Sequence, residues 1–365
     1  MTVRSILLST DAVGGVWTYT VDLARALARL GVEPVIAAMG PKAPKLPDGL
    51  RVIETGLPLD WLADTSRDVR DAGTALARLA DAVDADVLQL HSAALACDVE
   101  FERPVVAVQH SCVATWWDAV RGGSLPRDFA WRRDMVECGL NAVDAVVAPS
   151  TAFAAQTARI YSLGRSPQVV HNGRKPLALP RRPRGDFVLT VGRLWDEGKN
   201  VRTLDEAAAR IDAPVEAIGP LSGPNGAAER FEHLRTSGPL DGSAIAERLA
   251  ARPVFASSAL YEPFGLSVLE AAQAGCALVL SDIPTFRELW SGAALFVEPT
   301  DARGFADAIT RVLRHAEERD RLGSAARLKA LAYTPDATAR RMLQIYERIA
   351  PQGHSAAQRM LAGAA

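Results

Sequence analysis

Short apolar segments alternate with amphipathic segments along most of the chain, and this alternation limits the possible folds more than any other feature. A first run extends from residues 4–9 (RSILLS) to residues 169–171, and a second from residues 187–191 (FVLTV) to residues 295–297. Continuous apolar segments of this length, with helical segments between them, are typical of buried parallel strands. The sequence therefore predicts an α/β protein with two parallel sheets, each covered by helices.

Residues 175–185 (KPLALPRRPRG) interrupt this alternation. Proline and arginine without periodicity are typical of a linker. We therefore predict one domain at residues 1–178, a second at residues 179–334, and a final helix with a tail at residues 335–365.

Length and charge exclude several classes of protein. The chain has 365 residues, enough for two domains of ordinary size, and 41 basic against 43 acidic side chains give a net charge of −2. A general nucleic-acid binder would have a basic excess. No apolar run approaches the roughly 18 residues that span a bilayer. We expect a cytoplasmic enzyme, and we interpret the linker arginines Arg181, Arg182 and Arg184 as solvated charge rather than a contact with an anionic membrane surface.

The cysteines predict neither a zinc site nor a disulfide framework. Cys97, Cys112, Cys138 and Cys276 form no C-x-x-C pair.

Residues 260–275 (LYEPFGLSVLEAAQAG) contain the most informative motif. Glu262 precedes a segment of helical periodicity and Glu270 lies inside it, with Gly265 at the turn between them. The free N–H groups of such a helix start bind anions. Two glutamates eight positions apart also occur by chance on solvated helix faces. The strand-like segment 276–282 that follows nevertheless places this helix near strand ends, where α/β proteins bind ligands. The motif suggests a ligand with both hydroxyl and phosphate groups.

The loop after the first strand of each half has a possible phosphate-binding feature: two glycines in the first half and two cations in the second. Arg193 and Lys199 lie in the loop of residues 192–200, where they could neutralise a diphosphate without a metal. Gly14 and Gly15 follow the first strand, and their backbone could approach a phosphate. A tight turn is the alternative for this pair, and the absence of G-x-G-x-x-G argues against a nicotinamide cofactor.

Two histidines end predicted strands of the first half. His91 and His110 lie where an open α/β sheet places its chemistry, although a histidine there is more often structural. Residues 111–123 (SCVATWWDAVRGG) are expected to form a mobile or acceptor-facing loop. Asp84-Ala85-Asp86, which precedes its strand, is interpreted as a plain turn and not as a metal-binding DxD motif.

Together, GRLWDEGKN, YEPFGLSVLEAAQAG and the Gly-Gly loop resemble the GT-B glycosyltransferases, and more closely the retaining family 4 type, the glycosyl transferases group 1. The resemblance extends over nearly the whole chain and is most specific in the second half. It implies two Rossmann-like domains that face each other across a cleft, with the last helix, residues 335–349, crossing back onto the first domain.

The resemblance also implies roles for individual residues. Glu262, His110, Arg193 and Lys199 correspond to catalytic positions, with Glu262 and His110 at the donor sugar and the two cations on the diphosphate. Glu270 corresponds to the residue that binds the nucleotide ribose. The donor-binding set as a whole is Gly14, Gly15, Arg193, Lys199, Glu262, Phe264, Gly265, Leu266 and Glu270. Ser150, Asn172 and Gly173 match lesser landmarks.

Three positions depart from the family pattern. Asn200 replaces the glycine that usually follows the lysine, Ser258-Ala259 replaces a Pro-Ser pair, and the turn at residues 218–223 reads IGPLSG. These departures concern recognition of the base more than the phosphate site.

The implied activity is transfer of a sugar, with retention of anomeric configuration, from a UDP- or GDP-type sugar nucleotide to an acceptor glycan, lipid or small molecule. Neither a metal nor a cofactor is expected, and the resemblance places the activity in polysaccharide or glycolipid biosynthesis, with peripheral contact at the inner membrane face as one setting. A GT-B sugar-nucleotide epimerase is one alternative, but it needs acid and base groups that the sequence does not identify. A non-catalytic nucleotide-sugar binding protein is another, and the complete set of Glu262, Arg193, Lys199 and His110 argues against it.

Overall fold

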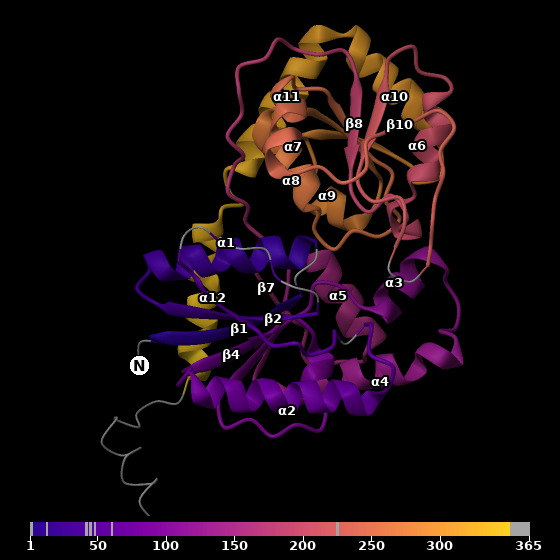
Figure 1. Cartoon of the computed structure of the whole chain (residues 1–365). Helices are drawn as coiled ribbons and strands as arrows, with labels where there is room; N and C mark the ends of the chain where they lie inside the picture. Colours follow the sequence, from indigo (N-terminus) through magenta and orange to yellow (C-terminus); the bar gives the residue numbers. More distant parts are fainter. Residues whose placement is uncertain are drawn as a thin grey trace, which may run out of the picture.

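The computed structural model describes residues 3–11, 14–40, 43, 46, 49–59, 61–223 and 226–350, and these form two parallel sheets (Figure 1). The first sheet has the strand order β3-β2-β1-β4-β5-β6-β7. Its strands are β1 (Ser5–Asp11), β2 (Glu33–Met39), β3 (Arg51–Glu54), β4 (Val87–Leu90), β5 (Val105–Val108), β6 (Ala145–Ala148) and β7 (Gln168–Val169). Every pair in this sheet is parallel, as strand–helix–strand connections require.

The second sheet repeats this plan with the order β10-β9-β8-β11-β12-β13. Its strands are β8 (Val188–Val191), β9 (Val215–Ile218), β10 (Arg235–Thr236), β11 (Val254–Ser257), β12 (Ala277–Ser281) and β13 (Ala294–Val297). The chain therefore has the predicted architecture of two Rossmann-like α/β halves. The limit predicted between residues 178 and 179 falls within residues 170–187, which contain neither helix nor strand, and the limit predicted between residues 334 and 335 falls at the start of the last helix.

Helices cover both faces of the first sheet. On one face lie α2 (Ser66–Ala82), the 3-10 helix η1 (Ala93–Ala96) and α4 (Arg127–Ala142), and on the other lies α1 (Gly15–Arg29). The last helix, α12 (Pro335–Ile349), packs beside α1 on that second face, although it follows the second half in sequence (Figure 1). Its buried Met342 and Ile345 share a core with Leu23 and Leu27. The predicted return of this helix to the first domain is thus confirmed.

The second half contributes six helices and one 3-10 helix to the described chain. They are η2 (Glu197–Lys199), α6 (Val201–Ala208), α7 (Gly242–Ala250), α8 (Leu266–Ala274), α9 (Pro284–Trp290), α10 (Ala302–Arg314) and α11 (Ala316–Ala330). Two linker arginines form ion pairs on this half, Arg182 with Glu247 and Arg184 with Asp320. One side chain of each pair is more than half exposed, Arg182 at 54% and Asp320 at 63%, which fits solvated linker charge. Among the described helices, none combines the length and apolarity needed to cross a bilayer.

Residues 113–120 were expected to belong to a loop, and this prediction was wrong. They form helix α3 (Val113–Val120), which Cys112 and Thr115 begin with reciprocal side chain–backbone hydrogen bonds. Cysteine is not among the usual N-cap residues, so the start of the helix gave no sequence signal. A further helix in this half, α5 (Thr151–Ile160), is capped by Ser150, whose hydroxyl accepts from the Phe153 N–H.

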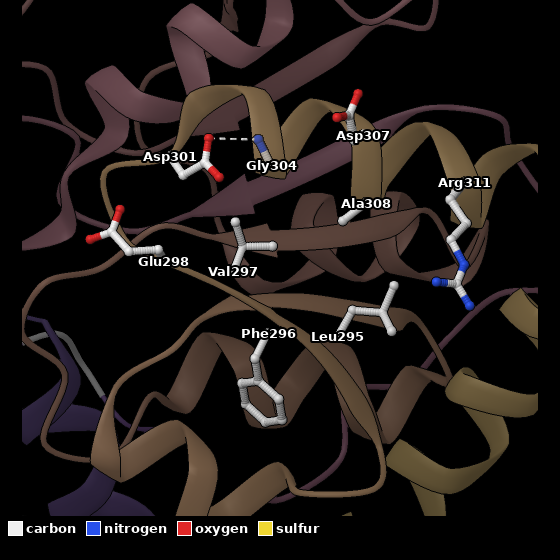
Figure 2. A pocket seen from close by; sticks show the side chains of 9 residues that line it. All are labelled: Leu295, Phe296, Val297, Glu298, Asp301, Gly304, Asp307, Ala308 and Arg311. Carbon is white, nitrogen blue, oxygen red and sulfur yellow. Dashed lines mark hydrogen bonds between the residues drawn. The ribbon is translucent and has the colours of Figure 1, made fainter.

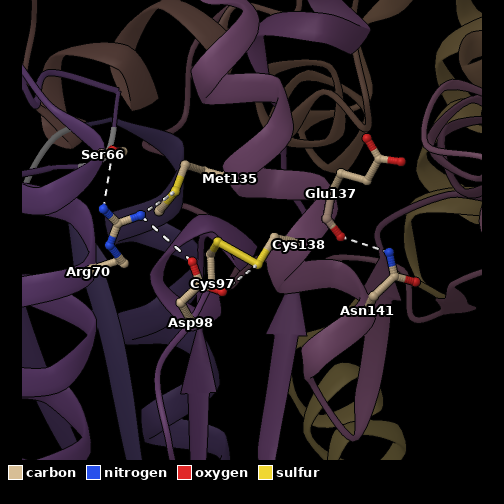
Figure 3. The surroundings of a disulfide bond; sticks show 8 residues. All are labelled: Ser66, Arg70, Cys97, Asp98, Met135, Glu137, Cys138 and Asn141. Atoms are coloured by element: carbon tan, nitrogen blue, oxygen red, sulfur yellow. Dashed lines mark hydrogen bonds and ion pairs between the residues drawn. A yellow bond between two sulfur atoms is a disulfide. The ribbon is translucent and has the colours of Figure 1, made fainter.

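The expectation of no disulfide was also wrong. Cys97 and Cys138 form a disulfide between the end of η1 and helix α4 (Figure 3). The two cysteines are 41 positions apart and meet only because η1 packs against α4. Within the described residues, the one cluster with metal-ligand geometry is this pair together with Asp98, and the disulfide engages both sulfur atoms.

Candidate functional site

The predicted glutamate loop lies at the start of α8, after strand β11. Gly265 precedes the helix with φ of 92°, a backbone conformation that other residues rarely adopt. A side chain at this position would also approach Glu262 Cγ and Phe286 to 3.3 Å. Glycine here therefore allows Glu262 to fold back beside the first turn of the helix, where free N–H groups favour an anion.

Lys199 and Glu262 meet at this point although they are 63 positions apart. The Lys199 ammonium lies 2.5 Å from Glu262 Oε2, and both side chains are largely buried. Their loops meet because β8 and β11 are neighbouring strands, and the N–H groups of Leu260 and Tyr261 donate to the Gly198 carbonyl. The structure thus brings a cation and a carboxylate to the helix start.

Arg193 lies in the same loop but is more exposed. Its guanidinium is 2.7 Å from Asp196 Oδ2, and the side chain is 55% exposed, which leaves it available to a ligand. Burial opposes ionisation of Asp196, but Arg193, Lys199 and N–H donors hold the pKa of its carboxyl below the ordinary value. Asp196 is therefore an anion that orients Arg193.

The Gly14–Gly15 loop of the first half faces this helix start. An added Cβ at Gly15 would lie 3.6 Å from Leu266 Cδ1, and Gly14 has φ of 76°. The two glycine-containing loops therefore meet between the two halves.

The two histidines form a pair at the strand ends of the first half. His91 Nδ1 is 2.8 Å from His110 Nε2, the rings stack with centroids 5.0 Å apart, and the Tyr19 ring meets His110 edge-on at 4.6 Å. Burial lowers the pKa of His110 to about 4, and burial together with His110 lowers the pKa of His91 well below its ordinary value. Both imidazoles are therefore neutral near pH 7.

Glu270 has a partner that the sequence did not indicate. Arg174 Nε donates to Glu270 Oε1 at 2.6 Å, and Arg174 Nη1 donates to Asp22 Oδ2 at 2.7 Å. Asp22 belongs to α1 and Glu270 to α8, so this arginine joins the two halves. Asp22 lies 152 positions from Arg174, and no local pattern links them.

Phe264 differs from the other predicted donor-binding residues. Its side chain is buried and meets the Tyr333 ring edge-on at 5.6 Å. The side chain is part of the core, so only its backbone remains for a ligand.

Aromatic residues between the two halves were missed as part of this region. Trp116 Nε1 donates to Asp196 Oδ1 at 3.0 Å, and the Tyr261 hydroxyl lies 2.7 Å from Thr115 Oγ1 and 3.1 Å from Ser111 Oγ. A Cβ at Gly198 would come within 2.7 Å of Trp116 Nε1. These contacts join helix α3 to the second half beside Lys199.

A separate hollow of about 470 Å³ lies between β13 and α10 (Figure 2). Its lining is Leu295, Phe296, Val297, Glu298, Asp301, Gly304, Asp307, Ala308 and Arg311. None of these residues belongs to the predicted donor site, and Asp301 caps α10 by accepting from the Gly304 N–H at 2.8 Å.

Two family models match consecutive parts of the chain. The Glycosyltransferase Family 4 model matches residues 13–176, and the Glycosyl transferases group 1 model matches residues 176–329. A phosphatidyl-myo-inositol mannosyltransferase of Mycobacterium leprae is 24% identical over 377 residues, covering 94% of this chain and 96% of the relative. A D-inositol 3-phosphate glycosyltransferase of Jonesia denitrificans is 27% identical over 56% of this chain and 51% of its own length.

Solved structures share the fold. A sucrose-phosphate synthase from Thermosynechococcus elongatus aligns with a TM-score of 0.79 and 20% identity, covering 94% of this chain and 98% of that one. The Anabaena protein HepE, solved in complex with UDP and glucose, aligns with a TM-score of 0.70 and 14% identity over 94% of this chain and 99% of its own.

Proposed function

The chain belongs to the GT-B glycosyltransferases of the family 4 and group 1 type, and from this we propose that it transfers a sugar from a nucleoside-diphosphate sugar with retention of anomeric configuration and without a metal ion. The observation that supports this most is the meeting of Lys199, Glu262 and the start of α8 beside the Gly15 loop.

Charge separation defines what the site must stabilise. When the bond between the anomeric carbon and the diphosphate breaks, negative charge collects on the diphosphate and positive charge on the sugar. Lys199, Arg193 and the N–H groups at Gly265 and Leu266 would stabilise the diphosphate, and each such contact typically contributes about 3 kcal/mol to lowering the barrier. The two cations and the helix start stabilise the negative charge that a metal ion stabilises in other transferases.

The carboxylates have separate roles in this proposal. When the donor diphosphate binds Lys199, it replaces Glu262 as the partner of the ammonium. Glu262 is then available to bind hydroxyls of the sugar. Arg174 occupies Oε1 of Glu270 and leaves Oε2 to accept from the ribose. Acceptor attack occurs on the face that the diphosphate leaves, and a diphosphate oxygen takes the acceptor proton, so no dedicated base is needed.

Donor hydrolysis provides the first test. The protein is incubated with radiolabelled UDP- and GDP-sugars, and UDP-glucose and GDP-mannose are the first choices because HepE was solved with UDP and glucose and one relative is named a mannosyltransferase. We expect slow release of free sugar that EDTA does not abolish. Epimer formation would support the epimerase, and binding without turnover would support the non-catalytic alternative.

Acceptors are tested next with the donor so identified. Phosphatidyl-myo-inositol and D-inositol 3-phosphate come first because the relatives are named for them. NMR of the product gives the anomeric configuration directly. An inverted linkage would contradict the proposed stereochemistry.

A further inference from the structure

Gln89 is a buried polar residue of the first sheet. It lies in β4, between Leu88 and Leu90, and is fully buried. A buried amide needs partners for both its oxygen and its nitrogen. Its Oε1 contacts the hydroxyl of Tyr346, a fully buried residue of α12. Its Nε2 lies 3.1 Å from His91 Nε2. Gln89 therefore connects the last helix to the histidine pair.

The direction of these hydrogen bonds follows from chemistry. The Tyr346 hydroxyl donates to the amide oxygen, which directs the amide N–H₂ group of Gln89 toward His91. An amide N–H₂ group only donates, so His91 Nε2 accepts. The Thr20 hydroxyl lies 3.2 Å from the same nitrogen and 2.8 Å from the Val16 carbonyl, and it agrees with this direction when its single proton is donated to His91.

The same reasoning extends to His110. A neutral imidazole has one protonated nitrogen. With Nε2 of His91 accepting, the proton of His91 is on Nδ1, which lies 2.8 Å from His110 Nε2 and donates to it. The proton of His110 is then on Nδ1, and Nδ1 is the ring nitrogen that remains for a ligand.

We propose that Gln89, His91 and Tyr346 are positioning residues that keep the proton of His110 on Nδ1, so that His110 offers a hydrogen-bond donor to an oxygen of the donor sugar. His110 follows β5, and the hydroxyl of the next residue, Ser111, meets Tyr261 of the second half. The ring thus lies on the side of the first domain that faces the second. This inference rests on the proposed role of His110 at the sugar.

The arrangement gives the last helix a second role besides packing. Helix α12 follows the second half in sequence but places Tyr346 against the first sheet. The Tyr346 hydroxyl is therefore the first member of a series of three hydrogen bonds that ends at His110.

Nitrogen NMR of the full-length chain tests the proton positions. With ¹⁵N-labelled histidine, and resonances assigned by single histidine substitutions, we expect His91 and His110 to be neutral with protonated Nδ1. A protonated Nε2 on His110 in the wild type would overturn the proposal.

The variant Tyr346→Phe keeps the ring but removes the hydroxyl that orients Gln89. We expect His110 to populate both proton positions and kcat for donor hydrolysis to fall by roughly tenfold to a hundredfold, with KM nearly unchanged. The matched control is Tyr161→Phe, which removes another buried hydroxyl, one that contacts Cys112 Sγ, outside this network. Equal histidine spectra and equal kcat in the two variants would contradict the proposal.

The outcomes separate this inference from the function on which it rests. If the wild type hydrolyses no sugar nucleotide, the proposed function fails, whereas the histidine spectra still report the network. If hydrolysis proceeds but His110 has its proton on Nε2, the positioning role alone fails.

Discussion

Lys199 and Glu262 form an ion pair beside the start of α8, and a donor diphosphate that binds Lys199 would have to separate them. Their contact, at 2.5 Å, keeps two largely buried charges paired. A buried charge without a partner is costly, so the pairing compensates for the burial of both groups.

Replacing either cation should reduce activity much more than stability. We expect Lys199→Ala and Arg193→Ala each to lower kcat/KM for donor hydrolysis by about 10²–10³-fold, because each removes one charge from the developing diphosphate. Arg193→Ala should leave the melting temperature nearly unchanged, since its side chain is 55% exposed.

The control for these variants is Arg303→Ala, which removes a cation that is 85% exposed on α10. We expect wild-type kinetics for this control. Wild-type kinetics for Lys199→Ala would refute its assignment to the diphosphate.

Asn200 shows why a departure from the family pattern is tolerated. It adopts φ of 50° at the start of α6, in the left-handed region that favours glycine and, after it, asparagine. Its Nδ2 also donates to the carbonyls of Ser258 and Pro299 at 3.0 and 2.8 Å.

We expect Asn200→Ala to reduce the free energy of unfolding by about 2 kcal/mol, because it combines left-handed strain with the loss of both hydrogen bonds. Asn200→Gly should cost less, since it removes only the hydrogen bonds. Urea titration of both variants measures the difference. A glycine variant that is the less stable of the two would contradict this explanation.

At the level of elements, helix α9 of the second half caps helix α5 of the first. Glu288 accepts from the N–H groups of Thr151 and Ala152, each at 2.8 Å, and lies 3.2 Å from His171 Nε2. Burial opposes its ionisation, but these hydrogen bonds prevail and lower the pKa of Glu288 to about 2. A carboxylate at a helix N-terminus is also favoured by the helix dipole.

This shift predicts an acid-sensitive contact between the two halves. The carboxyl has an ordinary pKa of 4.5 when released and about 2 when bound, so the contact is fully stabilised above pH 4.5 and is lost as the pH falls toward 2. The shift in the pKa of Glu288 corresponds to about 3 kcal/mol of stabilisation of the contact near neutral pH. Small-angle scattering between pH 6 and pH 3 should show an expansion of the wild type. The radius of gyration of Glu288→Gln should not change with pH over this range, because glutamine does not titrate. An identical pH profile for the two proteins would count against the cap.

The disulfide joins η1 to α4 on the opposite side of the first sheet from α1 and α12. It closes a loop of 41 residues, and cross-links of this span typically add about 3–4 kcal/mol. We expect a reducing agent to lower the melting temperature of the wild type but not that of a Cys97→Ala/Cys138→Ala variant. An unchanged wild type would show that the bond contributes little.

At the level of the whole molecule, the sequence predicts what depends on local periodicity. Both sheets and the glutamate loop follow from strand and helix patterns, whereas the return of the last helix was implied only by the family resemblance. Neighbouring strands bring Lys199 to Glu262. Three contacts join residues that are far apart in the sequence: the Cys97–Cys138 disulfide over 41 positions, Arg174–Asp22 over 152 and Gln89–Tyr346 over 257. Such pairs arise only when the elements pack, so no spacing rule reveals them. Helix α3 was missed because an unusual residue, Cys112, caps it.

Contacts between the halves also depend on the assembled molecule. Trp116 meets Asp196, Tyr261 meets Ser111, and the Ser150 hydroxyl donates to the Pro263 carbonyl at 2.8 Å. The first of these contacts involves the loop of Arg193 and Lys199, and the other two involve the loop before α8, so contacts between the halves flank the proposed donor site.

A crystal structure with the nucleoside diphosphate of the preferred donor tests the central claim most directly. We predict that its distal phosphate lies within hydrogen-bonding distance of Lys199, Arg193 and the N–H groups of Gly265 and Leu266, with the ribose at Glu270. A diphosphate bound elsewhere, or one that leaves the Lys199–Glu262 pair intact, would contradict the account.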